Sequence, residues 1–173
     1  MKYIPTWCCN SIFELDYEIL KENNIKCILS DLDNTLAPYN VAIPSNEVVE
    51  LIKKLKEEGF MVVIVSNNTG KRVKTFATEL DIDYISGAKK PFTSAIKKYL
   101  ETNNIPIDDC VLIGDQMMTD IRCAKKMNCR CVLTTPLSKN ESIITFINRK
   151  IDIYLRKKYD VIKNCKKIDR SGR

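Results

Sequence analysis

The sequence predicts an α/β fold, a Rossmann-like three-layer sandwich built on a mostly parallel sheet. Short, continuously apolar runs such as residues 60–65 are typical of strands that are buried on both faces. Between these runs the apolar residues recur at helical spacing, which favours parallel strands joined by crossover helices. Polar motifs directly follow several of the runs, and ligands of such sheets bind beyond the carboxyl ends of the strands.

A strand at 26–30 and a helix at 45–58 open the predicted alternation. Ser45 suits the N-cap of this helix, and Gly59 suits its end. One apolar stripe is expected to be buried: Val48, Val49, Ile52 and Leu55. The later elements are expected at 60–65 (strand), about 70–80 (helix), 83–85 (strand), about 92–103 (helix), 110–113 (strand), about 117–127 (helix) and 131–133 (strand).

The 173 residues are enough for one domain with a full core. We expect this domain over residues 1–157, followed by a basic tail at 158–173. Trp7 and Phe13 indicate that the N-terminal segment packs, either over the site or along an edge of the sheet. Within the domain, the expected parts are the N-terminal segment (1–25), the catalytic core (26–135) and, after Pro136, a C-terminal helix (136–157).

Composition excludes several classes of protein and site. No apolar run reaches the about 18–20 residues of a spanning helix, and acidic residues interrupt the first 30, so a soluble cytoplasmic protein is expected. The eight cysteines include no Cys-x-x-Cys and the chain has no histidine, which excludes the usual zinc spacings. Reduced thiols are expected. Without histidine, no Ser-His or Cys-His nucleophile pair is possible.

Two carboxylates follow the first predicted strand. Asp31 stands where a nucleophile can attack phosphorus and form an acyl-phosphate. Asp33, two residues on, can face the same site, protonate the leaving oxygen and then take a proton from the attacking water. A metal-binding or turn-forming pair is the alternative for this motif.

The next two motifs supply a hydroxyl and an ammonium. Ser66 is expected to donate to a phosphoryl oxygen, with Asn67 beside it in the same phosphate-binding role, although a turn or helix cap is the alternative for Ser66. Lys90, whose backbone is restricted by Pro91, would offset the negative charge of the nucleophile and the phosphoryl group. Lys89 is the competing assignment.

The last motif, Gly-Asp-Gln-Met-Met-Thr-Asp at 114–120, supplies a second acidic pair. Asp115 is expected to bind a divalent cation together with Asp31 and the backbone carbonyl of Asp33. Because these ligands are all oxygens, Mg²⁺ is the expected ion. Asp120 is expected to act through water or by orienting Lys90, and a helix-start acid that faces the dipole is its alternative.

These motifs resemble those of the haloacid dehalogenase superfamily, and within it the YqeG-type phosphatases of subgroup IIIA. The resemblance implies a Rossmann-like sheet, dependence on Mg²⁺ and hydrolysis of a phosphomonoester. A capless fold is expected from the spacing, because the 35 positions from Asp31 to Ser66 and the 24 from Ser66 to Lys90 leave no room for a sizeable cap domain. The YqeG type is similar to mitochondrial phosphatidylglycerophosphate phosphatase, which implies a lipid substrate. The matching segments are Asp31-Leu-Asp-Asn-Thr-Leu, Val65-Ser-Asn-Asn, Ala88-Lys-Lys-Pro, Ile113-Gly-Asp-Gln-Met-Met-Thr-Asp and the C-terminal Phe146-Ile-Asn-Arg-Lys.

The net charge of +6 is concentrated at the C-terminus. Residues 149–173 carry ten Lys/Arg and three Asp, a net of +7. A basic amphipathic helix there would either rest on an anionic membrane or pack on the domain, and no aromatic platform indicates nucleic acid as a partner. The expected apolar face is Ile143, Ile147, Ile151, Leu155 and Ile162, and the charges are Arg149, Lys150, Arg156, Lys157 and Lys158.

Three functions remain open from the sequence. The first is a phosphatidylglycerophosphate phosphatase, and the second is a phosphatase of a soluble metabolite, a protein or a nucleic-acid end. The third is a phospho-receiver domain without enzymatic activity, although its phosphorylated Asp would follow a middle strand, where this chain has Ser66. A dinucleotide-binding domain is disfavoured because no Gly-x-Gly-x-x-Gly follows the first strand.

Overall fold

The computed structural model describes residues 3–138 and 143–170, with only the backbone for 143–149. Within these residues, seven strands form one sheet in the order β4-β3-β2-β5-β6-β1-β7, and every pairing between them is parallel. The predicted Rossmann-like α/β architecture is therefore confirmed. The strands are β1 (Trp7–Cys8), β2 (Cys27–Ser30), β3 (Met61–Val65), β4 (Asp83–Ile85), β5 (Cys110–Gly114), β6 (Arg130–Leu133) and β7 (Lys166–Lys167).

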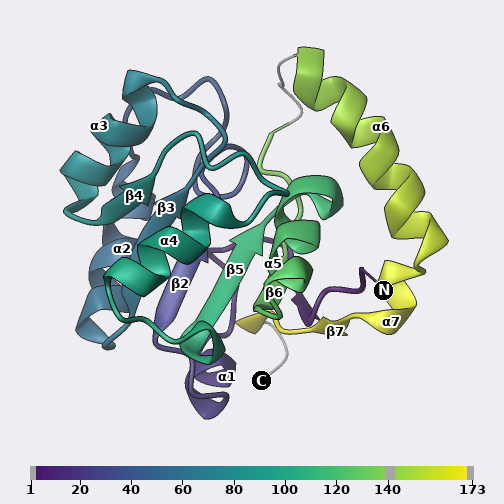
Figure 1. Cartoon of the computed structure of the whole chain (residues 1–173), viewed down its shortest axis with the longest axis horizontal. Helices are drawn as coiled ribbons and strands as arrows, with labels where there is room; N and C mark the ends of the chain where they lie inside the picture. The colour runs from purple at the N-terminus through teal and green to yellow at the C-terminus, as the bar shows by residue number, and fades with distance from the viewer. Residues whose placement is uncertain (1–2, 139–142, 171–173) are drawn as a thin grey trace.

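Helices cover both faces of the sheet (Figure 1). Successive residues of a strand point to opposite faces, so Ile28 packs in the layer of α2 and α3 and Leu29 packs in the layer of α4 and α5. This burial on both faces is the reason that the strands are continuously apolar. The helices are α1 (Tyr17–Glu22), α2 (Asn46–Glu57), α3 (Lys71–Leu80), α4 (Ser94–Thr102), α5 (Arg122–Lys126), α6 (Ile143–Lys158) and α7 (Val161–Asn164), with a 3₁₀ turn at Ile107–Asp109 and a π-helical turn at Met117–Ile121.

The predicted core elements are present, with differences in which residues are buried. The Ser45 hydroxyl accepts the N–H of Val48 and caps α2 as expected. The predicted apolar stripe is wrong at Val49, which is 38% exposed, because Leu51 is the residue that turns toward the sheet. Met61, the first residue of β3, is also exposed.

The carboxyl edge of the central strands carries no large insertion. A loop and α2 connect β2 to β3, and α3 connects β3 to β4. No element in these connections could serve as a cap domain, since every residue between β2 and β4 is described. The capless architecture is thus confirmed.

The N-terminal segment braces the edge of the sheet. β1 pairs with β6, and the Trp7 side chain is only 5% exposed. Residues 158–173, set apart above as a basic tail, are tied into the domain as far as they are described. β7 pairs with β1, and Ile168 is buried beside it. The sequence gives no sign of this strand, because it consists of two adjacent lysines, Lys166 and Lys167.

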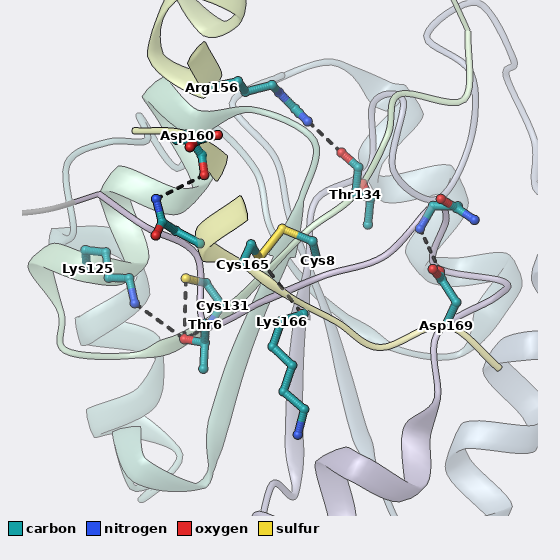
Figure 2. Close-up of a disulfide and its surroundings, with 12 residues drawn as sticks. Thr6, Cys8, Lys125, Cys131, Thr134, Arg156, Asp160, Cys165, Lys166 and Asp169 are labelled. Atoms are coloured by element: carbon teal, nitrogen blue, oxygen red, sulfur yellow. Dashed lines mark hydrogen bonds between the residues drawn. A yellow bond between two sulfur atoms is a disulfide. The ribbon is translucent and has the colours of Figure 1, made fainter. Parts of the chain in front are cut away.

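A disulfide between Cys8 and Cys165 joins the two ends of the chain (Figure 2). The expectation of reduced thiols is wrong for this pair. The pairing of β1 with β7 brings the two Cα atoms to 5.9 Å, although they are 157 positions apart in sequence. Among the described cysteines, the other six are free and buried, as expected for small apolar side chains.

The C-terminal helix α6 runs along one side of the molecule (Figure 1). The predicted apolar face is only partly present: Leu155 packs on the core, whereas Ile151 and Ile162 are exposed. Side chains are described on α6 only from residue 150 onward. The predicted contributions of Ile143, Ile147, Arg149 and most of the Phe146-Ile-Asn-Arg-Lys segment therefore lie outside the described residues. Among the described helices, none combines the length and the apolar character required to cross a lipid bilayer.

Candidate active site

Parallel pairing aligns the predicted nucleophile with the second acidic motif. The N–H of Asp31 donates to the carbonyl of Ile113 at 2.8 Å, so Asp31 leaves β2 beside the point where Gly114 and Asp115 leave β5. Asp31 and Asp115 are far apart in sequence, but they lie close together because the parallel strands β2 and β5 end at the same edge of the sheet.

Lys90 lies at the centre of the site. Its Nζ donates to Asp31 Oδ1 at 2.7 Å and to the carbonyl of Val65 at 2.7 Å, and it lies 2.7 Å from Asp120 Oδ1. The side chain is buried, so this ammonium is held between two carboxylates with little access to water. Lys90, rather than the exposed Lys89, is therefore the lysine of the site.

Three buried carboxylates form a compact group at the strand ends. One oxygen each from Asp31, Asp115 and Asp120 lies within 4.8 Å of the others, a grouping that can hold a metal ion. The π-helical turn lets Asp120 fold back toward β5, where its Oδ2 accepts the N–H of Gln116 at 3.1 Å. A Cβ on Gly114 would lie 2.3 Å from the Asp120 carboxyl carbon, so this close approach requires glycine.

The crowding of charge changes the acidity of the site. Burial raises the pKa of the Asp31 carboxyl, and the charges of Asp120 and Asp115 add to this rise while Lys90 opposes it. Burial would lower the pKa of Lys90, but the carboxylates of Asp120 and Asp31 outweigh it, and the pKa lies above its usual value. Lys90 therefore stays protonated and neutralises part of the negative charge of Asp31 and Asp120.

The Asp33 carboxylate lies outside the group of three. It forms an ion pair with Arg72 Nη1. Burial raises the pKa of Asp33 even though the charges of Arg72 and Lys90 oppose the rise. The structure therefore places the Asp33 side chain against Arg72, outside the carboxylate group, and only its backbone carbonyl remains a candidate for the expected cation contact.

Ser66 and Asn67, which follow β3, make different contacts. Ser66 is fully buried at the end of β3, and its hydroxyl accepts the N–H of Asn68 at 3.0 Å, so it also makes the turn considered as its alternative role. The Asn67 side chain bonds to both backbone groups of Lys90, at 2.6 and 3.0 Å. The Asn67 amide thus positions Lys90, and only its backbone N–H remains a candidate for the predicted phosphate contact.

Sequence reasoning missed Arg72, which crosses from α3 to the loop that follows β2. Besides the pair with Asp33, its guanidinium donates to the backbone carbonyls of Val41 and, at 3.0 Å, Pro38. Three contacts on one loop indicate that Arg72 fixes the position of Asp33. In the sequence this residue is one of two adjacent basic residues, Lys71 and Arg72, in a helical first turn, and such a pair usually faces solvent.

Comparison with known proteins agrees with this geometry. A family model described as haloacid dehalogenase-like hydrolase matches residues 9–134, which include all four motifs. The chain belongs to this family. With Probable phosphatase YqeG from Bacillus subtilis it shares 35% identity over 150 residues, which cover 87% of each chain. The resemblance seen in the sequence is therefore confirmed, and this haloacid dehalogenase-like hydrolase is a phosphatase.

Two further relatives set the range of the similarity. Phosphatidylglycerophosphate phosphatase 1, chloroplastic/mitochondrial, from Arabidopsis thaliana is 29% identical over 91% of this chain, which spans 48% of that protein. The cobalt-bound deoxy-D-mannose-octulosonate 8-phosphate phosphatase from Haemophilus influenzae superposes with a TM-score of 0.52 at 14% identity, over 81% of this chain and 92% of that one. The second likeness shows a shared fold.

Proposed function

We propose that this phosphatase uses Mg²⁺ and an aspartyl-phosphate intermediate to hydrolyse phosphatidylglycerophosphate at the surface of an anionic membrane. The observation that carries the chemistry is the buried Lys90 ammonium, which lies 2.7 Å from both Asp31 and Asp120 within the carboxylate group. A buried cation beside a nucleophilic carboxylate stabilises the charge of a phosphoryl group during transfer.

The reaction follows from the positions of the side chains. A carboxylate oxygen of Asp31 attacks phosphorus, the bond between phosphorus and the ester oxygen breaks, and Asp33 gives its proton to the leaving oxygen. Water then attacks the acyl-phosphate and transfers a proton to Asp33, which frees phosphate and restores Asp31. Ser66 and the backbone N–H of Asn67 bind phosphoryl oxygens, and Lys90 balances their charge.

The donor set fits the proposed cation. Asp31 and Asp115, both buried, would be the direct ligands, the carbonyl of Asp33 would be a third, and Asp120 would act through water or through Lys90. When bound there, Mg²⁺ would neutralise charge on the phosphoryl group. Carboxylates this close repel one another, so a divalent cation would also relieve that repulsion.

The lipid substrate is supported by the similarity to the Arabidopsis enzyme and by the surface of the C-terminal region. Ile153 and Tyr154 on α6 are each 61% exposed, and Ile162 on α7 is 97% exposed. Lys157 and Lys158 are exposed on the same helix as the first two. Exposed apolar side chains among basic ones suit the interface of an anionic bilayer.

Arg156 does not belong to this outer face, contrary to the sequence prediction. Its guanidinium turns inward to the backbone of Asp115 and Thr134. The surface that would face a membrane therefore carries one positive charge fewer than the sequence predicts, and the exposed lysines of α6 supply the rest.

A substrate panel tests the proposal. Phosphate release would be measured with liposomes that carry phosphatidylglycerophosphate and with soluble phosphomonoesters, each with Mg²⁺ and with excess chelator. We expect the lipid to be turned over at least about tenfold more efficiently, a difference of about 1.4 kcal/mol in transition-state free energy, and no turnover without the cation. Soluble phosphates turned over orders of magnitude faster would overturn the lipid substrate and leave the phosphatase chemistry standing.

A further inference from the structure

An ion pair on α6, between a buried carboxylate and a partly exposed guanidinium, contacts the backbone of Asp115 and of Met117. Asp152 is 1% exposed, and its Oδ2 accepts the Nε–H of Arg156 at 2.7 Å, one helical turn later. Its Oδ1 accepts the backbone N–H of Met117. Both oxygens of this buried carboxylate are thus engaged, one with its own helix and one with the turn that follows Asp115.

Arg156 completes the contact from the other side. Its Nη2 donates to the backbone carbonyl of Asp115 at 2.7 Å and to that of Thr134 at 3.3 Å (Figure 2 shows the second bond). Thr134 in turn donates its N–H to the carbonyl of Gly114 at 2.9 Å. The guanidinium therefore fastens the end of β5 to the segment that leaves β6.

We propose that Asp152 and Arg156 are positioning residues that hold the loop bearing Asp115 in the geometry that binds the cation. The proposal rests on the magnesium site of the proposed function and is independent of the lipid substrate. The two residues touch the carbonyl of Asp115 and the N–H of Met117, so they fix the two peptide groups that directly follow the Asp115 side chain. The π-helical turn that carries Asp120 begins at Met117 and is held by the same contact.

The chemistry of the pair favours this role over simple docking of the helix. An ion pair with a buried carboxylate contributes little net stability, because loss of hydration offsets much of the attraction. A planar guanidinium with hydrogen bonds in fixed directions instead fixes geometry. Outer contacts of this kind orient metal ligands in many proteins, and their removal typically weakens metal binding.

Mg²⁺ titration of the whole chain, followed by calorimetry, tests the proposal without any substrate. Arg156→Met keeps the length of the stem and removes the donors, and Lys157→Met is the matched control because Lys157 is exposed on the next position of α6. We expect the dissociation constant for Mg²⁺ to rise about tenfold in Arg156→Met and to stay within twofold in the control.

Amide hydrogen exchange without metal gives a second readout. Exchange should accelerate about tenfold for amides of residues 115–121 in Arg156→Met and stay unchanged in peptides of β2 and β3, since opening of this loop alone is the expected local event. A folded variant that binds Mg²⁺ as tightly as the unmutated protein would overturn the proposal. If the unmutated protein itself bound no Mg²⁺, the proposed cofactor would fail instead, and the exchange rates alone would decide on the positioning role.

Two conservative variants keep the test sharp if Arg156→Met does not fold. Arg156→Lys keeps the positive charge next to Asp152 but has too few donors in one plane to reach Asp115 and Thr134 together. Asp152→Asn keeps the shape and an acceptor for Met117. Each should show an intermediate loss of Mg²⁺ affinity, about threefold. Affinity equal to that of the unmutated protein in both would overturn the proposal.

Discussion

The centre and the edge of the sheet are held together in different ways. β2, β3 and β5 have four or five residues each and pack between two layers of helices, with nearly every residue buried. β1 and β7 have two residues each, and a disulfide joins them. The central strands are stabilised by apolar burial, at about 1.5–3 kcal/mol for each large side chain, whereas the edge depends on a covalent bond.

The proposed catalytic residues therefore lie in a different part of the sheet from the disulfide-linked edge strands. The side chains that act on phosphate follow the central strands, where packing already fixes the backbone. The edge strands carry none of the site residues and act through support. Substitutions of the site residues that follow the central strands should therefore abolish activity with little unfolding, and changes at the edge should lower stability with little loss of activity.

The largest effect is expected for Asp31→Asn, which breaks the chemistry at the centre. Loss of the nucleophile should lower the turnover rate at least about 10⁴-fold. The melting temperature should change little, because Lys90 keeps its contact with Asp120. Phosphate release and thermal unfolding measure the two effects. Asp108→Asn, an exposed change far from the strand ends, is the control. Near-normal turnover in Asp31→Asn would show that another group is the nucleophile.

The next effect belongs to the edge. Reduction of the Cys8–Cys165 bond should lower the free energy of unfolding by about 2–5 kcal/mol, because the bond closes a long loop and restricts the unfolded chain. Urea unfolding with and without dithiothreitol measures this change, and activity at low temperature should stay within twofold. Cys8→Ser should unfold like the reduced protein and be insensitive to dithiothreitol. Equal unfolding midpoints for the oxidised and reduced protein would contradict the role assigned to the edge.

The same comparison explains what the sequence could predict. Continuous apolar runs revealed β2, β3 and β5, because burial on both faces leaves a pattern within a few adjacent residues. The ends of those strands then located Asp31, Ser66 and Asp115. The parallel order brings these residues together without further information, so motif and fold support one another.

The rest depended on contacts between distant segments. A strand of two residues has no periodicity, so β1 and β7 could not be recognised, and the spacing of Cys8 and Cys165 says nothing about their meeting. Arg72 and Arg156 looked like surface charges because their partners are backbone carbonyls of other loops. The spacing of Asp152 and Arg156 by four residues was the one available signal, since such pairs meet on a helix.

Arg72→Met sharpens the comparison within the centre. Removing the guanidinium frees the loop that carries Asp33 without touching the carboxylate group, so the general acid should lose its fixed position. We expect the turnover rate to fall about 100-fold, the usual cost of a misplaced catalytic group. Mg²⁺ affinity should fall much less, because only one of the proposed ligands, the Asp33 carbonyl, depends on this contact. Lys71→Met, at the exposed preceding position, is the control. A turnover rate equal to that of the control would mean that Asp33 needs no support from α3.

The smallest effect is expected on the outer face of α6, which belongs neither to the central strands with their site residues nor to the disulfide-linked edge. Lys157→Gln with Lys158→Gln removes two exposed charges from this face, each expected to contribute about 1 kcal/mol of attraction to an anionic bilayer. Binding to vesicles rich in anionic phosphatidylglycerol, measured by co-sedimentation, should weaken about 30-fold, while turnover of a soluble phosphomonoester stays unchanged. Lys97→Gln with Lys98→Gln on α4 removes the same charge from another face and should leave binding within a few fold of the unmutated protein. Equal losses in the two double variants would mean that net charge, and not the α6 surface, draws the protein to the membrane, and the lysines of α6 would then be ordinary solvated side chains.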